Sequence, residues 1–205
     1  MDPRLKHPFT CVVAGPTGCG KTRFVASLVK HVSEMIVPVP QKIIWCYGEY
    51  QSFYSSMAHV EFSEGLPDLS RLDSSVKNLL VLDDLMSETD ERISKLFTKI
   101  SHHRNTSVIS IIQNVFDKGK HSRTISLNAQ YMVLFKNPRD ATQVVHLAKQ
   151  MYPGQLHFVK ESFRDATSKP HGYLLVDLKQ DTPDHLRLRT NIFPDEIQFV
   201  YMRKV

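Results

Sequence analysis

A glycine-rich segment near the N-terminus constrains the fold of this chain more than any other feature. Its sequence is GPTGCGKT, and it spans 15–22. It follows an apolar run, 9–14, and precedes a stretch with the 3.6-residue period of a helix. Glycine has no Cβ, so the backbone can curl tightly and turn its N–H groups inward, and a helix N-terminus adds a positive dipole end. A strand, a loop of this kind and a helix, in this order, predict a site that holds phosphate groups.

The loop fits the pattern G-x-x-x-x-G-K-[ST], in which the last two residues have separate tasks. Lys21 is expected to reach the β- and γ-phosphates of a nucleotide, and the Thr22 hydroxyl to bind Mg²⁺. The alternative is a glycine-rich turn with a surface lysine, which the apolar strand and the amphipathic helix on either side argue against. The predicted nucleotide-binding residues are therefore Gly15, Pro16, Thr17, Gly18, Cys19, Gly20, Lys21 and Thr22.

Apolar runs alternate with helical periods along the chain, which predicts an α/β fold with a mainly parallel central sheet flanked by helices. Buried strands are expected at 9–14, 42–47, 79–82, 107–112 and 131–135. Helices are expected at about 21–35, after an N-cap at Ser87, and at 140–151. The segment 48–78 is polar and irregular. We expect one domain over 1–205, in which 170–205 is a strand-rich part that extends the sheet edge or forms a short hairpin.

The composition is that of an ordinary globular chain, with 41% hydrophobic and 23% charged residues. A mainly disordered, collagen-like or disulfide-rich chain is thus not expected, and no apolar run approaches the roughly 20 residues of a membrane-spanning helix. The three cysteines, Cys11, Cys19 and Cys46, and the absence of a secretion signal predict free thiols in a reducing compartment. A net charge of +5 permits a polyanionic partner without requiring one.

Two adjacent carboxylates end one of the predicted strands. In NLLVLDD, four apolar residues come before Asp83 and Asp84. The carboxyl ends of parallel strands face the ligand crevice, so Asp83 is expected beside the phosphates, holding Mg²⁺ through water. Asp84 is expected to orient or deprotonate the attacking water, as hydrolysis of a nucleoside triphosphate requires. The alternative for both is a structural role at a turn or a helix cap.

A polar pair, Gln113-Asn114, follows the predicted strand at 107–112. If this strand adjoins the one that ends in Asp83, the Gln113 amide points at the γ-phosphate region. There it can hydrogen-bond the attacking water and sense hydrolysis. The alternative is an amide that caps the turn before Phe116.

Arg104 ends the helix before that strand, in the segment SHHRN. Cations at helix C-termini are common for dipole reasons alone. An exposed arginine there could instead reach the nucleotide of a neighbouring subunit and supply charge to the transition state. Arg123 and Arg139 are competing candidates for this role.

Other chemistries find less support in the sequence. The adjacent His102 and His103 point away from each other on a helix, and no Cys or acidic residue nearby has metal-ligand spacing, so zinc is not expected. Cys19 lacks a base to activate it and is interpreted as a small filler of the loop. A nucleotide kinase would need a mobile lid with paired arginines, and the region 123–140 does not have the character of a lid. A GTPase would need an Asn-Lys-x-Asp motif, which the sequence lacks. A nucleic-acid adaptor without catalysis does not explain Lys21, Thr22, Asp83 and Gln113 together.

Six segments carry a resemblance to a known family, and they are distributed over most of the chain, between residues 9 and 178. They are FTCVVAGPTGCGKTRF, KIIWCYGEYQ, NLLVLDDLM, LFTKISHHRNTSVISIIQNVF, RTISLNAQYMVLFKNPRD and KPHGYLLVDL. Together they resemble the viral DNA-packaging ATPases of the HerA/FtsK superfamily, above all the poxvirus-type enzymes and those of Maverick/Polinton elements. Many NTPases share the first segment, whereas SHHRN, the IIQN strand end and LNAQYMVLFKNPRD are far more specific.

This resemblance implies a RecA-like ATPase core, a ring-shaped homo-oligomer and ATP-driven threading of double-stranded DNA into a capsid. It makes Lys21 and Thr22 the nucleotide-loop residues, and Asp83 and Asp84 the metal and water acids. It makes Gln113 the sensor and gives Arg104 the place where related translocases carry an arginine that acts in trans. ATP and Mg²⁺ are the implied cofactors.

The same resemblance implies partners and a location. The partners are double-stranded DNA without sequence preference and portal or vertex proteins of the capsid, with no membrane. The location is inside the host cell, in the nucleus or a viral factory, with association with the virion also open. Candidates for DNA contact are the basic segments 118–123 and 136–139, which are also interpretable as plain solvated loops. A helicase or a plasmid or chromosome translocase stays open, because the same site chemistry serves all of them.

Overall fold

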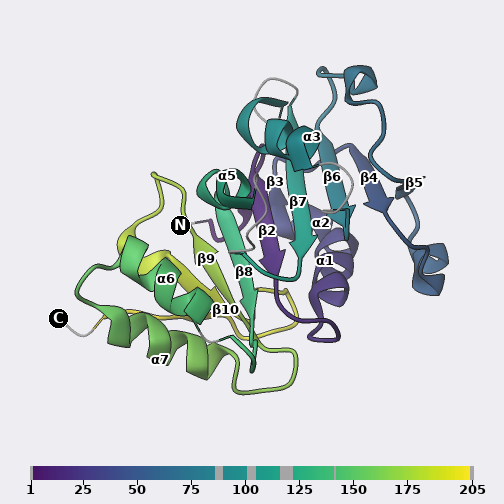
Figure 1. The fold of residues 1–205 in the computed structure, drawn as a ribbon. Helices are drawn as coiled ribbons and strands as arrows, with labels where there is room; N and C mark the ends of the chain where they lie inside the picture. The colour runs from purple at the N-terminus through teal and green to yellow at the C-terminus, as the bar shows by residue number, and fades with distance from the viewer. Residues whose placement is uncertain (1, 86–89, 101–104, 116–121, 141, 204–205) are drawn as a thin grey trace.

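The computed structural model describes residues 2–85, 90–100, 105–115, 122–140 and 142–203. Its central feature is a nine-stranded sheet with the order β11-β10-β9-β8-β2-β7-β6-β4-β5 (Figure 1). The strands of this sheet are β2 (Thr10–Ala14), β4 (Lys42–Tyr47), β5 (Glu61–Glu64), β6 (Asn78–Asp83), β7 (Thr106–Ile112), β8 (Tyr131–Phe135), β9 (Tyr173–Asp177), β10 (Leu188–Thr190) and β11 (Phe199–Val200). Two short strands, β1 (Leu5–Lys6) and β3 (Ile36–Val37), pair with each other in parallel.

The sheet is parallel from β5 across to β8 and antiparallel from β8 to β11. Every residue of β2, β6, β7 and β8 is buried, as expected for parallel strands that are covered on both faces. In Figure 1 the arrowheads of β2, β4, β6 and β7 point toward the same edge. The carboxyl ends of these strands therefore share one edge of the sheet, and the loops that follow them meet there.

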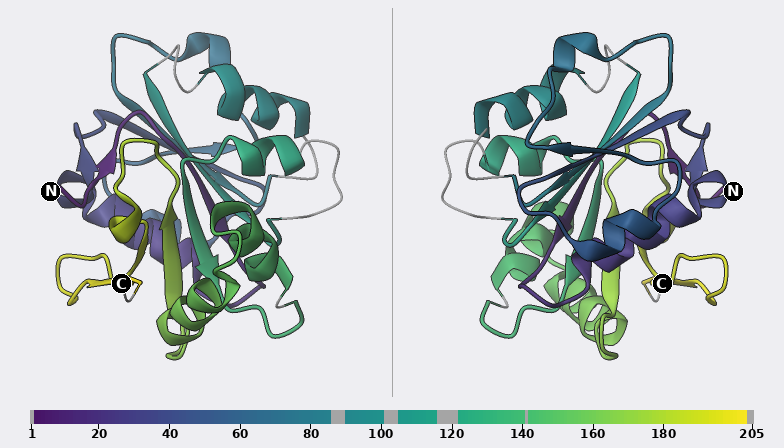
Figure 2. Two further views of the ribbon diagram at one scale, coloured as in Figure 1. Left: turned by 90° about the vertical axis from the view of Figure 1, so that its left-hand side faces the viewer. Right: turned by 90° about the vertical axis from the view of Figure 1, so that its right-hand side faces the viewer.

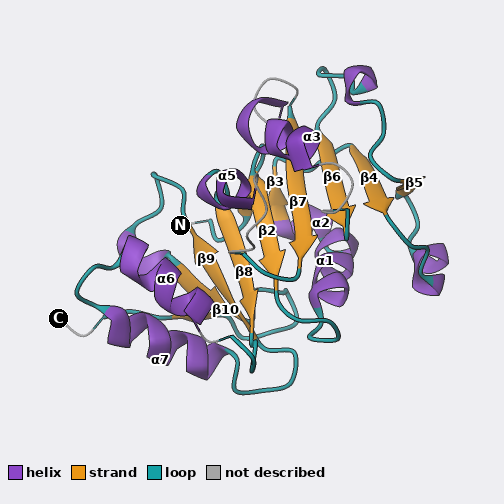
Figure 3. Ribbon diagram, viewed as in Figure 1, coloured by secondary structure: helices purple, strands orange, loops and turns teal. Residues whose placement is uncertain are grey.

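Helices cover both faces of the sheet (Figures 2 and 3). They are α1 (Lys21–Lys30), α2 (Val32–Met35), α3 (Asp90–Lys95), α5 (Ser122–Leu127), α6 (Thr142–Met151) and α7 (Leu156–Ala166). Short helical turns are η1 (Ser52–Ser56), η2 (Leu69–Arg71), η3 (Leu96–Ile100) and η4 (Asp184–Leu186). One buried cluster joins the sheet to α3, α5, α6 and α7, and the other joins its opposite face to α1, α2 and η1. Within the described ranges, none of the helices combines the length and the apolar character needed to cross a membrane.

The predicted α/β fold with a mainly parallel sheet is confirmed, and the five expected strands are present. The strand expected at 9–14 begins one residue later, and those expected at 79–82 and 107–112 are longer by one residue at one or both ends. The three strand-like pieces after residue 172 form β9, β10 and β11, which extend the sheet beyond β8. The N-cap expected at Ser87 lies outside the described residues.

The helix expected at about 21–35 is wrong in its extent, because it breaks at His31 into α1 and α2. The break lets Met35 and Ile36 turn into the core, where Ile36 pairs with Leu5 of β1. Tertiary pairing overrides the helical period here. The helix expected at 140–151 begins at Thr142.

Besides β1, β3 and the short helical turns, three elements are not expected from the sequence. The segment 48–78, interpreted as irregular, contains β5, which pairs in parallel with β4. The basic segment 118–123 was interpreted as a loop, yet Arg123 lies on α5, because the buried Ile125 anchors this short helix to the core. Helix α7 has an apolar side that faces the sheet, with Val159 and Ala166 buried.

A buried ion pair connects β9 to β10. Arg189 Nη2 donates to Asp177 Oδ2 at 3.1 Å, and both side chains are only 6% exposed. Arg189 Nη1 also donates to the carbonyl oxygen of Pro3 at 2.6 Å, so the pair attaches the N-terminal segment to the antiparallel end of the sheet. Breaking such a pair on one side leaves an uncompensated charge in the interior.

We expect Asp177→Asn to lower the free energy of unfolding by about 3–5 kcal/mol, because Arg189 keeps its charge and loses its partner. Glu61→Gln is the matched control, since its partner Lys42 lies across a strand pair at 2.8 Å but the two side chains are 47% and 60% exposed. Its effect should stay below about 1 kcal/mol. Urea unfolding followed by circular dichroism measures both, and equal effects would contradict this account of the β9–β10 pair.

Candidate nucleotide site

A cavity of about 410 Å³ lies at the edge of the sheet where β2, β6 and β7 end. Most of the residues predicted from the sequence to form a site line it together. They are Thr17, Gly18, Gly20, Lys21, Thr22, Asp83, Asp84 and Gln113. The structure therefore brings three separate segments of the chain to one place, as the strand-end argument predicts.

The glycine-rich loop begins tightly bound to the sheet. The backbone N–H of Gly15 donates to the carbonyl oxygen of Ile112 at 3.3 Å, which continues the β2–β7 pairing by one residue. A Cβ at Gly15 would lie 2.7 Å from Phe135 Cβ and 2.8 Å from Cys19 Sγ. Only glycine fits this close approach. Burial also raises the pKa of the Cys19 thiol, in agreement with its interpretation as a filler of the loop.

The loop ends at the first turn of α1. Gly20 is the N-cap residue, with φ of +111°, and no side chain caps the helix there. A side chain at this position would be strained by the backbone angle and would also press on His171, whose Nδ1 would be 3.1 Å from the added Cβ. The N-terminal end of a ten-residue helix thus faces the cavity without a protein side chain as its cap.

The Lys21 ammonium group lies inside the loop. Its Nζ donates to the carbonyl oxygens of Gly15 at 2.7 Å and Pro16 at 3.0 Å. These contacts direct the charge toward the concave side of the loop, where phosphate oxygens would be its stronger partners. Thr22 follows Lys21 on the first turn of α1, and both residues line the cavity.

Asp83 is the buried acid of the site, with only 5% of its surface exposed. Its Oδ2 accepts a hydrogen bond from the Tyr54 hydroxyl at 3.0 Å. Burial raises the pKa of Asp83, and the adjacent Asp84 charge adds to this, whereas the hydrogen bond from Tyr54 and the charge of Lys21 act in the opposite direction. Burial and the Asp83 charge also raise the pKa of Tyr54, so its hydroxyl stays protonated and donates.

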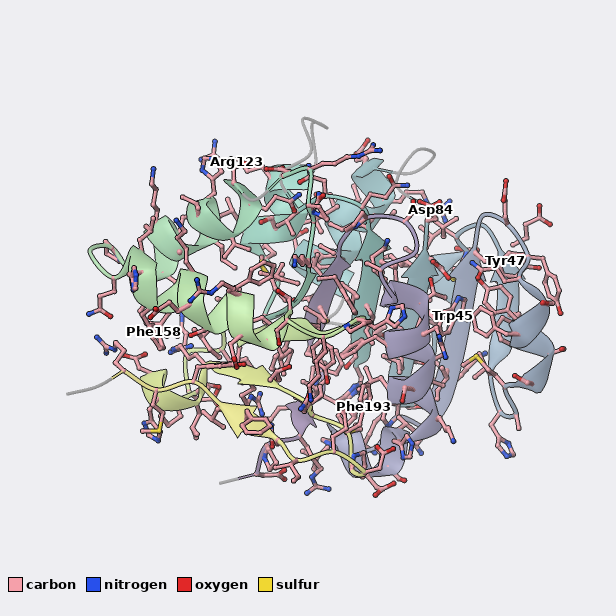
Figure 4. The ribbon with its side chains drawn as sticks, turned by 90° about the horizontal axis from the view of Figure 1, so that it is seen from below. Trp45, Tyr47, Asp84, Arg123, Phe158 and Phe193 are labelled. Carbon is pink, nitrogen blue, oxygen red and sulfur yellow. The ribbon has the colours of Figure 1, made fainter. Side chains whose placement is uncertain are left out.

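An aromatic cluster fixes Tyr54 in this position. Trp45 is fully buried on β4, and its ring centroid lies 5.7 Å from that of Tyr54. Phe62 of β5 stacks on Tyr54 at 4.9 Å, and Phe53 contacts it at 4.7 Å. Figure 4 shows Trp45 and Tyr47 on the same strand. The segment 48–64 therefore holds the Tyr54 hydroxyl against the Asp83 carboxylate.

Asp84 differs from its neighbour in exposure and backbone conformation. It is exposed, and its φ of +57° places it in the left-handed region, which Asp tolerates better than most residues. The preceding residue accepts a backbone hydrogen bond from Gly48 at 3.3 Å, which holds the turn at this strand end. The change of direction after Asp83 turns one carboxylate into the core and leaves the other at the cavity mouth.

Gln113 directly follows β7, which lies between β2 and β6. Ile112 pairs with Ala14 of β2, and Ile111 pairs with Asp83 of β6. The amide thus emerges between the start of the phosphate loop and the two acids, and it is exposed in the cavity. The condition that we set for Gln113, that its strand adjoins the acidic one, is met.

Three polar cavity residues are not predicted from the sequence, namely Gln51, Arg23 and His171. Gln51 follows the end of β4, so the strand-end rule that found Asp83 could have found it. Arg23 comes directly after Thr22 on α1. His171 precedes β9 with φ of +61°, and its Nδ1 lies 3.0 Å from the carbonyl oxygen of Cys19, a contact that sequence spacing does not reveal.

Two of the three candidate arginines, Arg123 and Arg139, belong to the described residues. Arg104, like the His102 and His103 pair, lies outside the described residues. Arg123 and Arg139 are exposed and do not line the cavity, and Figure 4 shows Arg123 well separated from Asp84. Among the residues that the structure describes, Arg23 is the arginine that the cavity contains.

The donor set of the cavity suits a hard cation that also binds phosphate. In the described part of the chain, no group of three His, Cys, Asp or Glu side chains could hold a metal alone. Mg²⁺ typically takes one or two carboxylate or hydroxyl oxygens and completes its shell with substrate phosphates and water. The Thr22 hydroxyl and the Asp83 carboxylate, both at this cavity, are oxygen donors of that kind.

Residues 11–130 match the family model described as RNA helicase, which is more than half of the 205 residues. The chain belongs to the RNA helicase family. The matched part of this RNA helicase family member includes the phosphate loop, both acids and Gln113. No curated protein matches the sequence.

This RNA helicase family member is similar in fold to solved NTPase structures. The genome packaging NTPase B204 from Sulfolobus turreted icosahedral virus 2, in complex with ATP-gammaS, has a TM-score of 0.59 at 12% identity, with 100% of both chains covered. The same protein in complex with AMP gives 0.55 at 14% identity, again over 100% of both chains. The cytoplasmic domain of the Thermomonospora curvata type VII secretion ATPase EccC gives 0.52 at 13% identity, covering 85% of this chain and 24% of that one. The fold is that of a P-loop NTPase.

The raised pKa of Asp83 predicts how stability depends on pH. The folded protein binds the proton of the Asp83 carboxyl group more tightly than the unfolded chain does. Ionisation of Asp83 therefore lowers the free energy of unfolding as the pH rises through the folded-state pKa. This loss of stability is absent below about pH 4, the ordinary pKa of Asp. We expect Asp83→Asn to unfold at a higher temperature than the wild type at about pH 8, and this advantage to shrink as the pH falls toward 4. Tyr54→Phe, which removes a donor to the carboxylate, should change stability in the opposite direction. Thermal unfolding across this range tests both, and a pH-independent difference would contradict the burial of a charge at Asp83.

Proposed function

We propose that this chain is an ATP-hydrolysing motor that acts on nucleic acid, and that it threads double-stranded DNA into a capsid. The proposed ATP hydrolysis rests on one observation: the phosphate loop, Asp83, Asp84 and Gln113 line the same cavity. Its volume of about 410 Å³ lies within the range of small-molecule sites.

Each residue has a separate role in the proposed hydrolysis. Lys21 and the N-terminal end of α1 bind the β- and γ-phosphates and stabilise the charge that develops on them. Thr22 and Asp83 would hold Mg²⁺, which would supply positive charge to the phosphates. Asp84 orients the attacking water and accepts its proton, and Gln113 hydrogen-bonds the same water from the neighbouring strand.

DNA packaging rests on two further observations. The six segments that resemble HerA/FtsK packaging ATPases extend over most of the chain. The fold also aligns over its full length with a protein described as a genome packaging NTPase. The proposal includes a homo-oligomeric ring, partners among capsid portal or vertex proteins, and action in the host nucleus or a viral factory. In a ring the charge of +5 per subunit would repeat around the pore, where Lys136 and Arg139 are exposed candidates for phosphate contact.

An RNA helicase is the second candidate, because the family model that matches the chain has that description. The two candidates share the chemistry of ATP hydrolysis and differ in the nucleic acid that couples to it. Which polymer stimulates hydrolysis therefore separates them.

We expect purified protein to hydrolyse ATP faster with double-stranded DNA than with single-stranded RNA of equal length. The stimulation should fall steeply with salt and be independent of DNA sequence, because the contacts go to backbone phosphates. A steady-state ATPase assay across the polymers measures it. Stimulation by RNA alone would favour the helicase, and no stimulation by either polymer would contradict a nucleic-acid motor.

Two substitutions separate phosphate binding from water activation. Lys21→Ala should weaken ATP binding and abolish hydrolysis, because it removes charge from the phosphates in both ground and transition states. Asp84→Asn should retain ATP binding while hydrolysis falls by roughly 10²-fold or more, the usual contribution of general base catalysis. Asp181→Asn, at an exposed carboxylate outside the cavity, is the control. Hydrolysis by Asp84→Asn at the wild-type rate would make Asp84 a structural residue.

The arginine that completes the site is proposed to come from a neighbouring subunit, with Arg104 as the first candidate. We expect Arg104→Ala to assemble yet to hydrolyse ATP slowly, since such an arginine contributes roughly 10³–10⁵-fold in rate. Mixing Arg104→Ala with Lys21→Ala subunits should restore partial activity, because some interfaces then join an intact loop to an intact arginine. Absence of recovery in rings proven to be mixed would exclude Arg104 and direct the test to Arg123 or Arg139.

A further inference from the structure

A second cavity, of about 260 Å³, adjoins the phosphate site. The two cavities share Gly20, Arg23 and His171, which lie around the first turn of α1. Asp83, Asp84 and Gln113 line only the first of them. The second cavity therefore borders the phosphate site on the side away from the strand ends that carry the acids.

The wall of this second cavity is aromatic. Phe24, Phe135 and Tyr173 are buried, at 6%, 4% and 5% exposure, and they come from α1, β8 and β9. Phe193, in the segment between β10 and β11, is half-buried, and its ring centroid lies 5.2 Å from that of Phe24. Figure 4 shows Phe193 well separated from Asp84. The ring of Phe193 is thus the part of the wall that is accessible to a flat ligand.

Backbone and side-chain hydrogen bonds hold Phe193 in place. The Tyr173 hydroxyl accepts from the backbone N–H of Ile192 at 2.9 Å, and Glu196 Oε2 accepts from that of Phe193 at 3.3 Å. The backbone N–H of Glu196 in turn donates to the carbonyl oxygen of Phe193 at 3.0 Å. These hydrogen bonds fix the 192–196 turn, and Phe193 in this turn packs against Phe24 of α1.

A nucleotide bound at the loop can extend its nucleoside into the second cavity, which shares Gly20, Arg23 and His171 with the phosphate site. Its terminal phosphate lies toward the acids and Gln113, so the ribose and base continue past Gly20 toward the side that His171 and Arg23 share. We propose that the second cavity binds the purine base of this nucleotide, with Phe193 as its stacking face. This inference rests on the proposed binding of a nucleoside triphosphate at the phosphate loop.

The polar groups of the cavity fit such a base. Ser27 and Glu196 line it beside the aromatic rings, and a carboxylate there accepts a hydrogen bond from an exocyclic amine. Adenine and guanine both carry such an amine and have two fused rings to cover the aromatic wall. A pyrimidine has half of that ring system, so the cavity should bind purine nucleotides more tightly than pyrimidine nucleotides.

The test compares ATP with inorganic tripolyphosphate, which has the phosphates and no base. In Phe193→Ala the Kd for Mg·ATP should rise by at least about fivefold, the lower range for loss of one aromatic stacking partner, while the Kd for Mg·tripolyphosphate stays at its wild-type value. Phe199→Ala is the matched control, since Phe199 lies nearby on β11, is 54% exposed and lines neither cavity. Isothermal titration calorimetry measures both dissociation constants for the wild type and for each of the two variants.

A second variant keeps the test decisive if Phe193→Ala does not fold. Ser27→Leu fills the cavity from the half-buried side of α1 and should weaken ATP binding without affecting tripolyphosphate. Unchanged ATP affinity, or equal loss for both ligands, in the folded variants would overturn the base site while leaving phosphate binding intact. Failure of the wild-type protein to bind either ligand would overturn the nucleotide proposal itself.

Discussion

The parallel pairing of β7 with both β2 and β6 is the interaction on which the site depends. It places Ile112 beside Ala14 and Ile111 beside Asp83, so the ends of the three strands lie side by side, with an offset of one residue along β7. The phosphate loop and Gln113 directly follow β2 and β7, whereas Asp83 is the last residue of β6 and Asp84 comes next. Because all three strands are fully buried, their register is specified by the hydrophobic contacts on both faces, and a slip of one residue would exchange those faces. The geometry of the site is thus a consequence of the core.

The acidic strand end shows how the core and the site compete. Asp83 lies at a position that burial makes unfavourable for a charge, and the protein offsets this with the Tyr54 hydroxyl, which an aromatic cluster holds in place. The left-handed turn at Asp84 then directs the second carboxylate outward. Two adjacent residues of the same chemical type thereby acquire different environments, which suits different roles.

Much of this arrangement could be predicted from the sequence, because it depends on local patterns. The apolar runs at 42–47 and 131–135 predict strands with the observed bounds, and the loop motif predicts the strand–loop–helix unit. The rule that ligands bind at the carboxyl ends of parallel strands then predicts that Asp83 and Gln113 belong to one site. What could not be predicted depends on contacts between distant segments. Tyr54 reaches Asp83 only because β5 pairs with β4, and His171 reaches the loop only because β9 pairs with β8, and neither pairing has a signature in the spacing of these residues.

The central claim is that phosphates bind inside the loop that Lys21 closes. The most direct measurement is a crystal structure of the protein with Mg²⁺ and ATPγS. The account predicts that Lys21 Nζ exchanges its bonds to the carbonyl oxygens of Gly15 and Pro16 for oxygens of the β- and γ-phosphates. It also predicts that the terminal phosphate lies between Asp84 and Gln113. A nucleotide bound elsewhere, with Lys21 still bonded to its own loop, would contradict it.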